Sequence, residues 1–143
     1  MEIVYDPDPT DVHVHERHAY VDGEIDERPG PWIWYYRATI RNRSDRPLRL
    51  TWLDAFHFEH GRWTPGNGRG RALDTAAIRE LLVDGDLDAE GGLPAGGEAI
   101  RPVGWILGEG PVREPVKWAV VAIDDDGVEH YAEAELGLVP YDD

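Results

Sequence analysis

Alternation of apolar and polar side chains is the dominant pattern in this chain. It is clearest over residues 32–41, where Tyr36, Ala38 and Ile40 alternate with polar residues. Successive side chains of a β-strand point to opposite faces, so this segment predicts a strand with one buried face. Residues 47–56 repeat the pattern after a short polar turn. We therefore expect the two segments to pair as a hairpin.

Further segments bounded by turn residues are predicted as strands: 12–15, 56–63, 98–107 and 116–138. Residues 116–123 form a nearly continuous apolar run, which is typical of a strand covered on both sides. His60-Gly61 and Asp124–Gly127 are typical of hairpin tips, so the second and fourth of these segments are predicted as hairpins. Pro102 has no backbone N–H, which predicts an edge position or a bulge for the third.

Helical periodicity occurs once, near residues 74–84. The apolar stripe of this segment consists of Ile78, Leu81 and Leu82. Asp74 or Thr75 can cap its N-terminus, and Gly85 can close its C-terminus. The pattern predicts one short inserted helix that covers a sheet edge or one end of the molecule.

About seven strands with short antiparallel connections can bury their apolar faces only against a second sheet. The sequence therefore predicts a mainly β protein, an antiparallel two-sheet sandwich of immunoglobulin or fibronectin III type. A small barrel is the alternative. A length of 143 residues fits a single domain spanning residues 1–143.

Charge restricts the classes of partner. The chain has 29 acidic and 14 basic residues, a net charge of −15. Such a surface repels phosphate backbones and anionic lipids, so neither a nucleic acid nor a membrane is expected as a partner. The acidity has two readings that the sequence leaves open. One is a GC-rich genome or a salt-rich cytoplasm, and the other is a basic partner.

Cysteine is absent, which excludes disulfides and thiolate metal sites. The first residues contain no basic region followed by an apolar run, and the longest apolar run, residues 118–123, is far too short to cross a bilayer. A cytoplasmic location is the resulting expectation.

No catalytic arrangement is recognisable. Ser44 is the single serine, and it falls in a turn without the supporting frame that a Ser-His-Asp triad needs. Residues 84–88 and 124–126 carry several aspartates, which we interpret as solvated turns rather than as calcium ligands or glycosidase carboxylates. We therefore expect that the chain is not an enzyme.

Tryptophan and arginine supply the candidate contacts with a partner, because both dominate interface hot spots. Trp32 and Trp63 are flanked by loops and arginines, and Arg69 and Arg71 lie in a glycine-rich loop. This loop lacks the strand and helix that a dinucleotide-binding motif requires. The remaining tryptophans are expected in the core: Trp34, Trp52, Trp105 and Trp118.

Histidines are concentrated near the N-terminus. His13 and His15 would share one face of a strand, and His18 would return across a turn. Imidazoles in such an arrangement suit a divalent transition metal, and His57 or His60 would complete the ligand set. A solvated strand face explains the same pattern without a metal.

The chain also resembles the ApaG family over roughly residues 32–139. The similar stretches are Tyr36–Asn42, Asp45–Leu50, Gly66–Gly70, Leu93–Glu98, Asp126–Gly127 and Leu136–Leu138. The resemblance implies a fibronectin III-like sandwich and an accessory or protein-binding role. Two features depart from the family pattern. The glycine-rich motif is Gly-x-Gly-x-Gly here rather than Gly-x-Gly-x-x-Gly, and the predicted helix is an insertion.

Two functional hypotheses follow. The first is a non-enzymatic interaction or accessory module without a cofactor, which binds another protein or a second copy of itself through a sheet edge. The second is a protein that binds a metal or small ligand at the histidine cluster.

Overall fold

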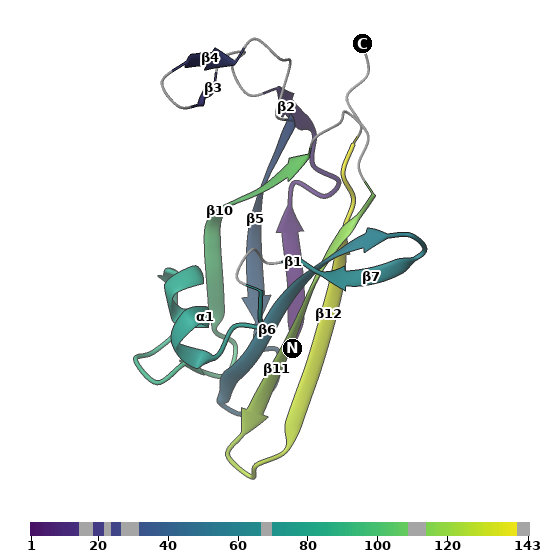
Figure 1. Cartoon of the computed structure of the whole chain (residues 1–143). Helices are drawn as coiled ribbons and strands as arrows, with labels where there is room; N and C mark the ends of the chain where they lie inside the picture. Colours follow the sequence, from purple (N-terminus) through teal and green to yellow (C-terminus); the bar gives the residue numbers. More distant parts are fainter. Residues whose placement is uncertain (15–18, 22–23, 27–31, 67–69, 109–113, 140–143) are drawn as a thin grey trace.

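The computed structural model describes residues 1–14, 19–21, 24–26, 32–66, 70–108 and 114–139, without the side chains of 12–14, 19–21, 24–26, 32, 107 and 108. Two antiparallel sheets pack face to face (Figure 1). The first sheet contains β1 (Glu2–Asp6), β2 (Val12–Val14), β5 (Trp32–Arg41), β8 (Asp84–Gly85) and β10 (Glu98–Gly108). The second contains β6 (Leu48–Glu59), β7 (Arg62–Pro65), β9 (Gly92–Leu93), β11 (Val116–Asp124) and β12 (Glu129–Leu136).

A separate pair, β3 (Ala19–Val21) and β4 (Glu24–Asp26), forms a small hairpin. The predicted antiparallel two-sheet sandwich is confirmed. Because the described strands form two separate main sheets, the barrel alternative is wrong. The strand order is β1-β5-β10-β8 in the first sheet and β12-β11-β6-β7 in the second.

β5 and β6 do not form the hairpin that their alternation predicts. Both strands are present, but β5 pairs with β1, β2 and β10, whereas β6 pairs with β11, β7 and β9. The turn between them therefore crosses from one sheet to the other. The predicted hairpins β6–β7 and β11–β12 are confirmed, and His60 and Gly61 both have positive φ, as a two-residue hairpin turn requires.

The crossing turn is held by the buried side chain of Asn42. Its amide nitrogen donates to the carbonyl oxygens of Arg46, Leu93 and Pro94 at 2.8–3.1 Å. Its side-chain oxygen accepts from Ser44. Both polar atoms of this side chain form hydrogen bonds, so its burial at the junction of the two sheets leaves no polar group of the side chain unsatisfied.

Both sheets contribute to one hydrophobic core, which contains Trp34 and Trp118 as expected. Tyr5 and Tyr36 meet Trp118 edge to face in its centre. Two of the tryptophans predicted in the core are not there. Trp52 is only partly buried, and Trp105 is exposed.

One β-bulge in each sheet explains these two errors. In β10 the register shifts by one residue between Arg101 and Gly104, at Pro102, where the sequence predicts an edge position or a bulge. In β6 it shifts between Leu50 and Trp52. A one-residue shift moves every following side chain to the opposite face of the sheet. Both tryptophans follow a shift, so they point outward.

α1 (Thr75–Leu81) lies where the sequence predicts the helix. Asp74 caps it by accepting a hydrogen bond from the N–H of Ala77 at 3.0 Å. Ile78 and Leu82 are buried against the core. The helix ends at Leu81 with Leu82 as its C-cap, rather than at the predicted Gly85, which instead belongs to β8.

Candidate interaction surface

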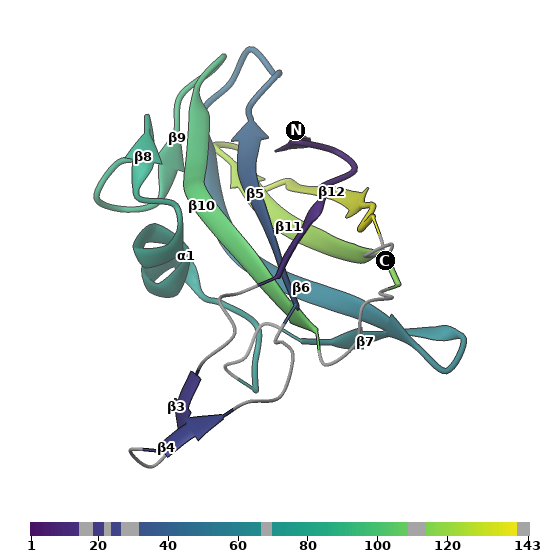
Figure 2. The same ribbon diagram turned by 90° about the horizontal axis from the view of Figure 1, so that it is seen from above.

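β10 forms an exposed border of the first sheet. β8 pairs only with Ala99 and Ile100, so no strand in the described part of the chain pairs with the outer edge of β10 beyond Ile100. Figure 2 shows β8 beside the start of β10 and the later part of β10 at the border of the sheet. An unpaired edge offers backbone N–H and C=O groups to another chain.

Apolar side chains gather along this edge on the outer face. Trp105 is 53% exposed, Val103 60% and Tyr35 39%. Trp105 lies directly opposite Tyr35 in the β5–β10 ladder, and the bulge that holds Val103 comes just before it. Large apolar side chains with such exposure, side by side on one face, are typical of a contact surface.

Gly104 makes this arrangement sterically feasible. It lies opposite Tyr36 and faces the core. A Cβ atom at Gly104 would stand 2.6 Å from Cζ of the Tyr36 ring, closer than van der Waals contact allows. The absence of a side chain lets Tyr36 fill the interior, while the next residue, Trp105, points to the outside.

Two guanidinium groups adjoin these side chains. Arg101 places its Cζ atom 5.1 Å from the centroid of the Trp105 ring, within the range of a cation–π contact. Arg37 is exposed on the same face as Tyr35, two residues along β5. Neither arginine forms an ion pair with a carboxylate in the part of the chain that the structure describes. We call Tyr35, Arg37, Arg101, Val103 and Trp105 the β10 surface.

The hydroxyl group of Tyr36 lies below the β10 surface. Burial raises the pKa of this hydroxyl, and the positive charge of Arg101 lowers it in part. Arg101 also donates a long hydrogen bond, 3.4 Å, to the carbonyl oxygen of Val103. The guanidinium group of Arg101 therefore lies near the bulge, the exposed indole of Trp105 and the buried hydroxyl of Tyr36.

Trp63, one of the predicted contacts, lies on a different surface. β6 and β7 extend beyond the sandwich as a two-stranded ribbon (Figures 1 and 2). On it, the Trp63 ring meets the Phe58 ring at a centroid distance of 5.2 Å. The amine of Lys117 lies 4.5 Å from the Trp63 centroid and 5.6 Å from that of Phe56. These contacts hold the base of the ribbon against β11, and a role of Trp63 in binding stays a prediction.

The other predicted contacts are not brought together with Trp63 in the described part of the chain. The backbone of Trp32 pairs with Val14 and Gly108, but its side chain lies outside the described residues, as does Arg69. Arg71 is exposed just before the segment in which Leu73 pairs with Leu53. Sequence reasoning missed Trp105, for which the signal was Pro102 and the bulge that it indicates.

The proposed histidine site falls mostly outside the described residues. This applies to His15, His18 and the side chain of His13. His57 pairs with Glu59 at 3.1 Å, and His60 occupies the turn at the tip of the ribbon. No group of three ligand atoms that includes a histidine occurs among the described residues. The metal hypothesis therefore gains no support from them.

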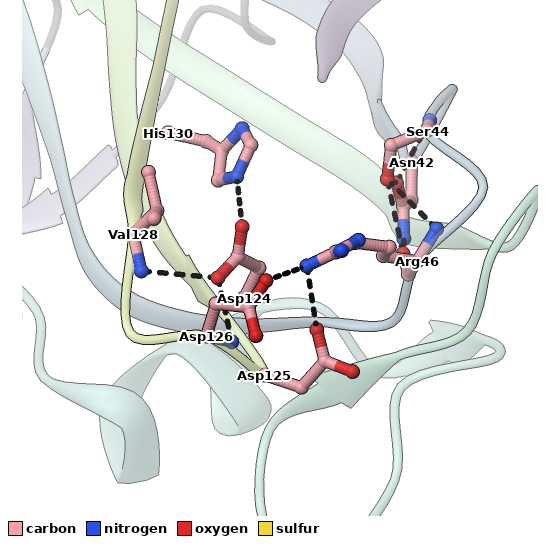
Figure 3. A network of polar contacts seen from close by, with 8 residues as sticks. All are labelled: Asn42, Ser44, Arg46, Asp124, Asp125, Asp126, Val128 and His130. Atoms are coloured by element: carbon pink, nitrogen blue, oxygen red, sulfur yellow. Dashed lines mark hydrogen bonds and ion pairs between the residues drawn. The ribbon is translucent and has the colours of Figure 1, made fainter.

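Carboxylates converge at the turn between β11 and β12 (Figure 3). Asp124, Asp125 and Asp126 each offer an oxygen within 4.8 Å of the others. Arg46 pairs with two of them, with a nitrogen–oxygen distance of 3.3 Å to Asp125. The third, Asp124, accepts hydrogen bonds from His130 and from backbone N–H groups of the turn. The contacts of these aspartates therefore stabilise the turn, in agreement with their interpretation as turn residues.

Ser44 also has a local role. Its hydroxyl donates to the side-chain oxygen of Asn42 at 2.6 Å in the crossing turn. Within the described residues, no helix has the length and apolar character required to cross a bilayer.

No family model and no curated protein matches this sequence. Similar solved structures exist. One is a crystal structure from Bordetella pertussis described as the "Putative ApaA Protein", with 14% sequence identity and a TM-score of 0.47. The match covers 92% of this chain and 96% of that chain. A similarity at this level carries no conclusion about function.

Proposed function

We propose that this chain is a non-enzymatic protein-interaction module, a β-sandwich that binds another protein through the β10 surface. The observation that carries the proposal is Trp105, a tryptophan more than half exposed on a strand edge that no other described strand pairs with. Val103 and Tyr35 surround it with further apolar surface, and Arg101 stacks on it. Tryptophan, tyrosine and arginine are the residues that most often dominate binding energy in protein interfaces.

The exposed area of Trp105 is large enough to contribute substantially to the free energy of binding. Covering the exposed half of a tryptophan side chain, about 100 Å², contributes about 2–3 kcal/mol at about 25 cal/mol per Å². The bulge holds Trp105 outward, so little reorganisation is needed before contact. A preorganised aromatic anchor binds with a smaller entropic cost than a mobile one.

The resemblance to the ApaG family over residues 32–139 is a second support. It implies an accessory or protein-binding role and a fibronectin III-like sandwich. We include membership of that family in the proposal. The fold that the resemblance implies agrees with the two antiparallel sheets.

A photoreactive amino acid at Val103 tests the proposal in cells that naturally produce the protein. We expect one discrete covalent adduct with another protein, and we expect Trp105→Ala in the same chain to abolish it. The matched control is the photoreactive amino acid at Val83, which is 64% exposed on a different part of the molecule. The same adducts from both positions, or none from Val103, would contradict the proposal.

A further inference from the structure

We infer that the partner presents an extended, acidic segment, which adds as a strand to the free edge of β10 and places its carboxylates on Arg37 and Arg101. This inference rests on the proposed function and specifies the chemistry of the partner. It is argued from the geometry of the edge and from the charges beside it.

The edge of β10 favours an extended segment. Beyond Ile100 the strand pairs with β5 on one side only in the described part of the chain. Addition of a strand satisfies unpaired backbone groups, and alternate side chains supply specificity. Pro102 removes one donor within the bulge, so pairing starts after it, at the level of Trp105. A helix would leave those backbone groups unpaired.

The charges favour carboxylates. The chain has about two acidic residues for each basic one, yet Arg37 and Arg101 have no carboxylate partner among the described residues. Arg37 is exposed, and Arg101 lies over Trp105. Guanidinium groups bind carboxylates with two parallel hydrogen bonds, among the strongest polar contacts in proteins. Two positive charges of this surface therefore have no neutralising carboxylate among the described residues, which favours a negatively charged partner.

The spacing also fits a strand. Side chains that share a face of a strand stand about 7 Å apart, because each residue rises about 3.3 Å. Tyr35 and Arg37 have this spacing on β5, and Trp105 lies across from Tyr35. Both arginines lie on the bulge side of Trp105, because Arg37 follows Tyr36 on β5 and Arg101 precedes the bulge on β10. An extended segment with an apolar residue against Trp105 and acidic residues toward the bulge would meet the indole and both guanidinium groups.

A second copy of this chain fits the edge less well. A symmetric pair of β10 edges brings two chains of identical net charge together, and like charges repel. Each copy carries a net charge of −15. A short acidic segment carries fewer negative charges than a second copy and is therefore repelled less, and salt screens charges beyond about 8 Å at physiological ionic strength.

Three synthetic peptides test the inference. They consist of Val-Thr-X-Thr repeats, which place the valines and the X residues alternately along one face of a strand, and they differ only in X, which is Glu, Gln or Lys. Binding of the labelled peptides to the full chain is measured by fluorescence anisotropy in 0.15 M salt, about physiological. We expect the Glu peptide to bind at least about tenfold more tightly than the Gln peptide, the effect of one charge-assisted hydrogen bond. The Lys peptide should bind no better than the Gln peptide.

Variants assign the preference to the two arginines. Arg37→Glu with Arg101→Glu should reverse the order so that the Lys peptide binds best. Arg37→Gln with Arg101→Gln, a milder change, should leave the Gln peptide bound and remove the advantage of the Glu peptide. The matched control is Arg62→Glu with Arg79→Glu, which changes the net charge equally at two exposed arginines elsewhere. It should preserve the order.

The inference is overturned if the Lys peptide binds as well as the Glu peptide, or if the Glu preference survives in the Arg37/Arg101 variants. It is also overturned if sedimentation shows a dimer that Trp105→Ala dissociates. The crosslink from Val103 separates the two proposals. An adduct to a basic segment leaves the interaction module standing and rejects only the acidic partner.

Discussion

Tyr5 carries a buried hydroxyl group that two backbone groups engage. It accepts a hydrogen bond from the N–H of Trp118 at 3.0 Å and donates one to the carbonyl oxygen of Ala134 at 2.7 Å. Trp118 and Ala134 lie directly opposite each other in the β11–β12 ladder. Burial raises the pKa of this hydroxyl, so it remains a neutral donor and acceptor. A residue of the first sheet thereby completes the hydrogen bonding of the second.

Tyr5→Phe should lower the free energy of unfolding by about 1–3 kcal/mol, because it leaves a buried N–H and a partly buried C=O without their partner. Urea denaturation measures the change. Tyr131→Phe is the matched control, because it removes a hydroxyl that donates to Glu133 on the exposed outer face. The control should change stability by less than about 0.5 kcal/mol. Equal effects of the two substitutions would show that the Tyr5 bridge does not stabilise the fold.

At the scale of elements, the turn between β11 and β12 shows how a hairpin tip is stabilised by its own aspartate. Asp124 accepts hydrogen bonds from His130 at 2.9 Å, from the N–H of Val128 at 3.0 Å and from the N–H of Asp126 at 2.9 Å. These hydrogen bonds, that of His130 first, lower the pKa of Asp124 below its ordinary value. The turn therefore stabilises the charged form of this residue.

The lowered pKa of Asp124 predicts how the hairpin responds to acid. A carboxyl group whose pKa is lower in the folded state stabilises the fold above its unfolded pKa of about 3.9. That contribution is lost as the pH falls through the lower, folded value. Asp124→Asn should therefore reduce the loss of stability between pH 5 and pH 3, about the range in which acid acts on carboxylates.

Urea denaturation at each pH measures this dependence. Asp45→Asn, at an exposed position in the neighbouring loop, is the control and should leave the slope of stability against pH as in the parent chain. A parent-like slope in Asp124→Asn would contradict the assignment.

At the scale of the whole molecule, the first and last described segments are joined. Thr10 and Leu138 form a parallel bridge, in which Thr10 donates to Gly137 and Val139 donates to Thr10. The indole N–H of Trp34 donates to the carbonyl oxygen of Val139 at 2.8 Å. These bonds join the two sheets at the edge where β1 and β12 lie, and the hydrogen bonds of Tyr5 join them again.

The net charge of −15 acts on the whole molecule. Screening shortens from about 10 Å at 0.1 M to about 3 Å at 1 M salt, which weakens self-repulsion in the folded state. We therefore expect 1 M sodium chloride to raise stability by about 1 kcal/mol, or Tm by about 3 °C for a chain of this length. Scanning calorimetry measures the shift. Glu129→Gln with Glu135→Gln reduces the charge on β12 and should show a smaller rise, whereas a fall in Tm of the parent chain would contradict the argument.

Most of the elements could be predicted from local pattern. The helix and the hairpins at His60-Gly61 and Asp124–Gly127 followed from capping and turn residues, whose effects are confined to neighbours in the chain. β1 was missed, although Ile3 and Tyr5 of this strand are buried. Its five residues carry too few alternations to stand out, and its place in the sheet comes from pairing with β5.

The candidate site was predicted less well than the fold, because it depends on which face a side chain occupies. Alternation groups Trp52 with Leu48 and Leu50, and it places Trp105 with the inward residues of β10. One extra residue in each strand reverses that assignment, since the side-chain period is two. Pro102 marks one bulge in the sequence, but the bulge in β6 has no comparable local mark.

The sequence by itself determined where strands, turns and the helix lie, because backbone preference and side-chain periodicity act over a few residues. Tertiary structure alone decided that β5 and β6 belong to different sheets, since their apolar faces would be buried equally well in a hairpin of one sheet or in two facing sheets. It also decided that Trp105 is exposed beside Arg101, because register and bulges are set by pairing between strands distant in the chain.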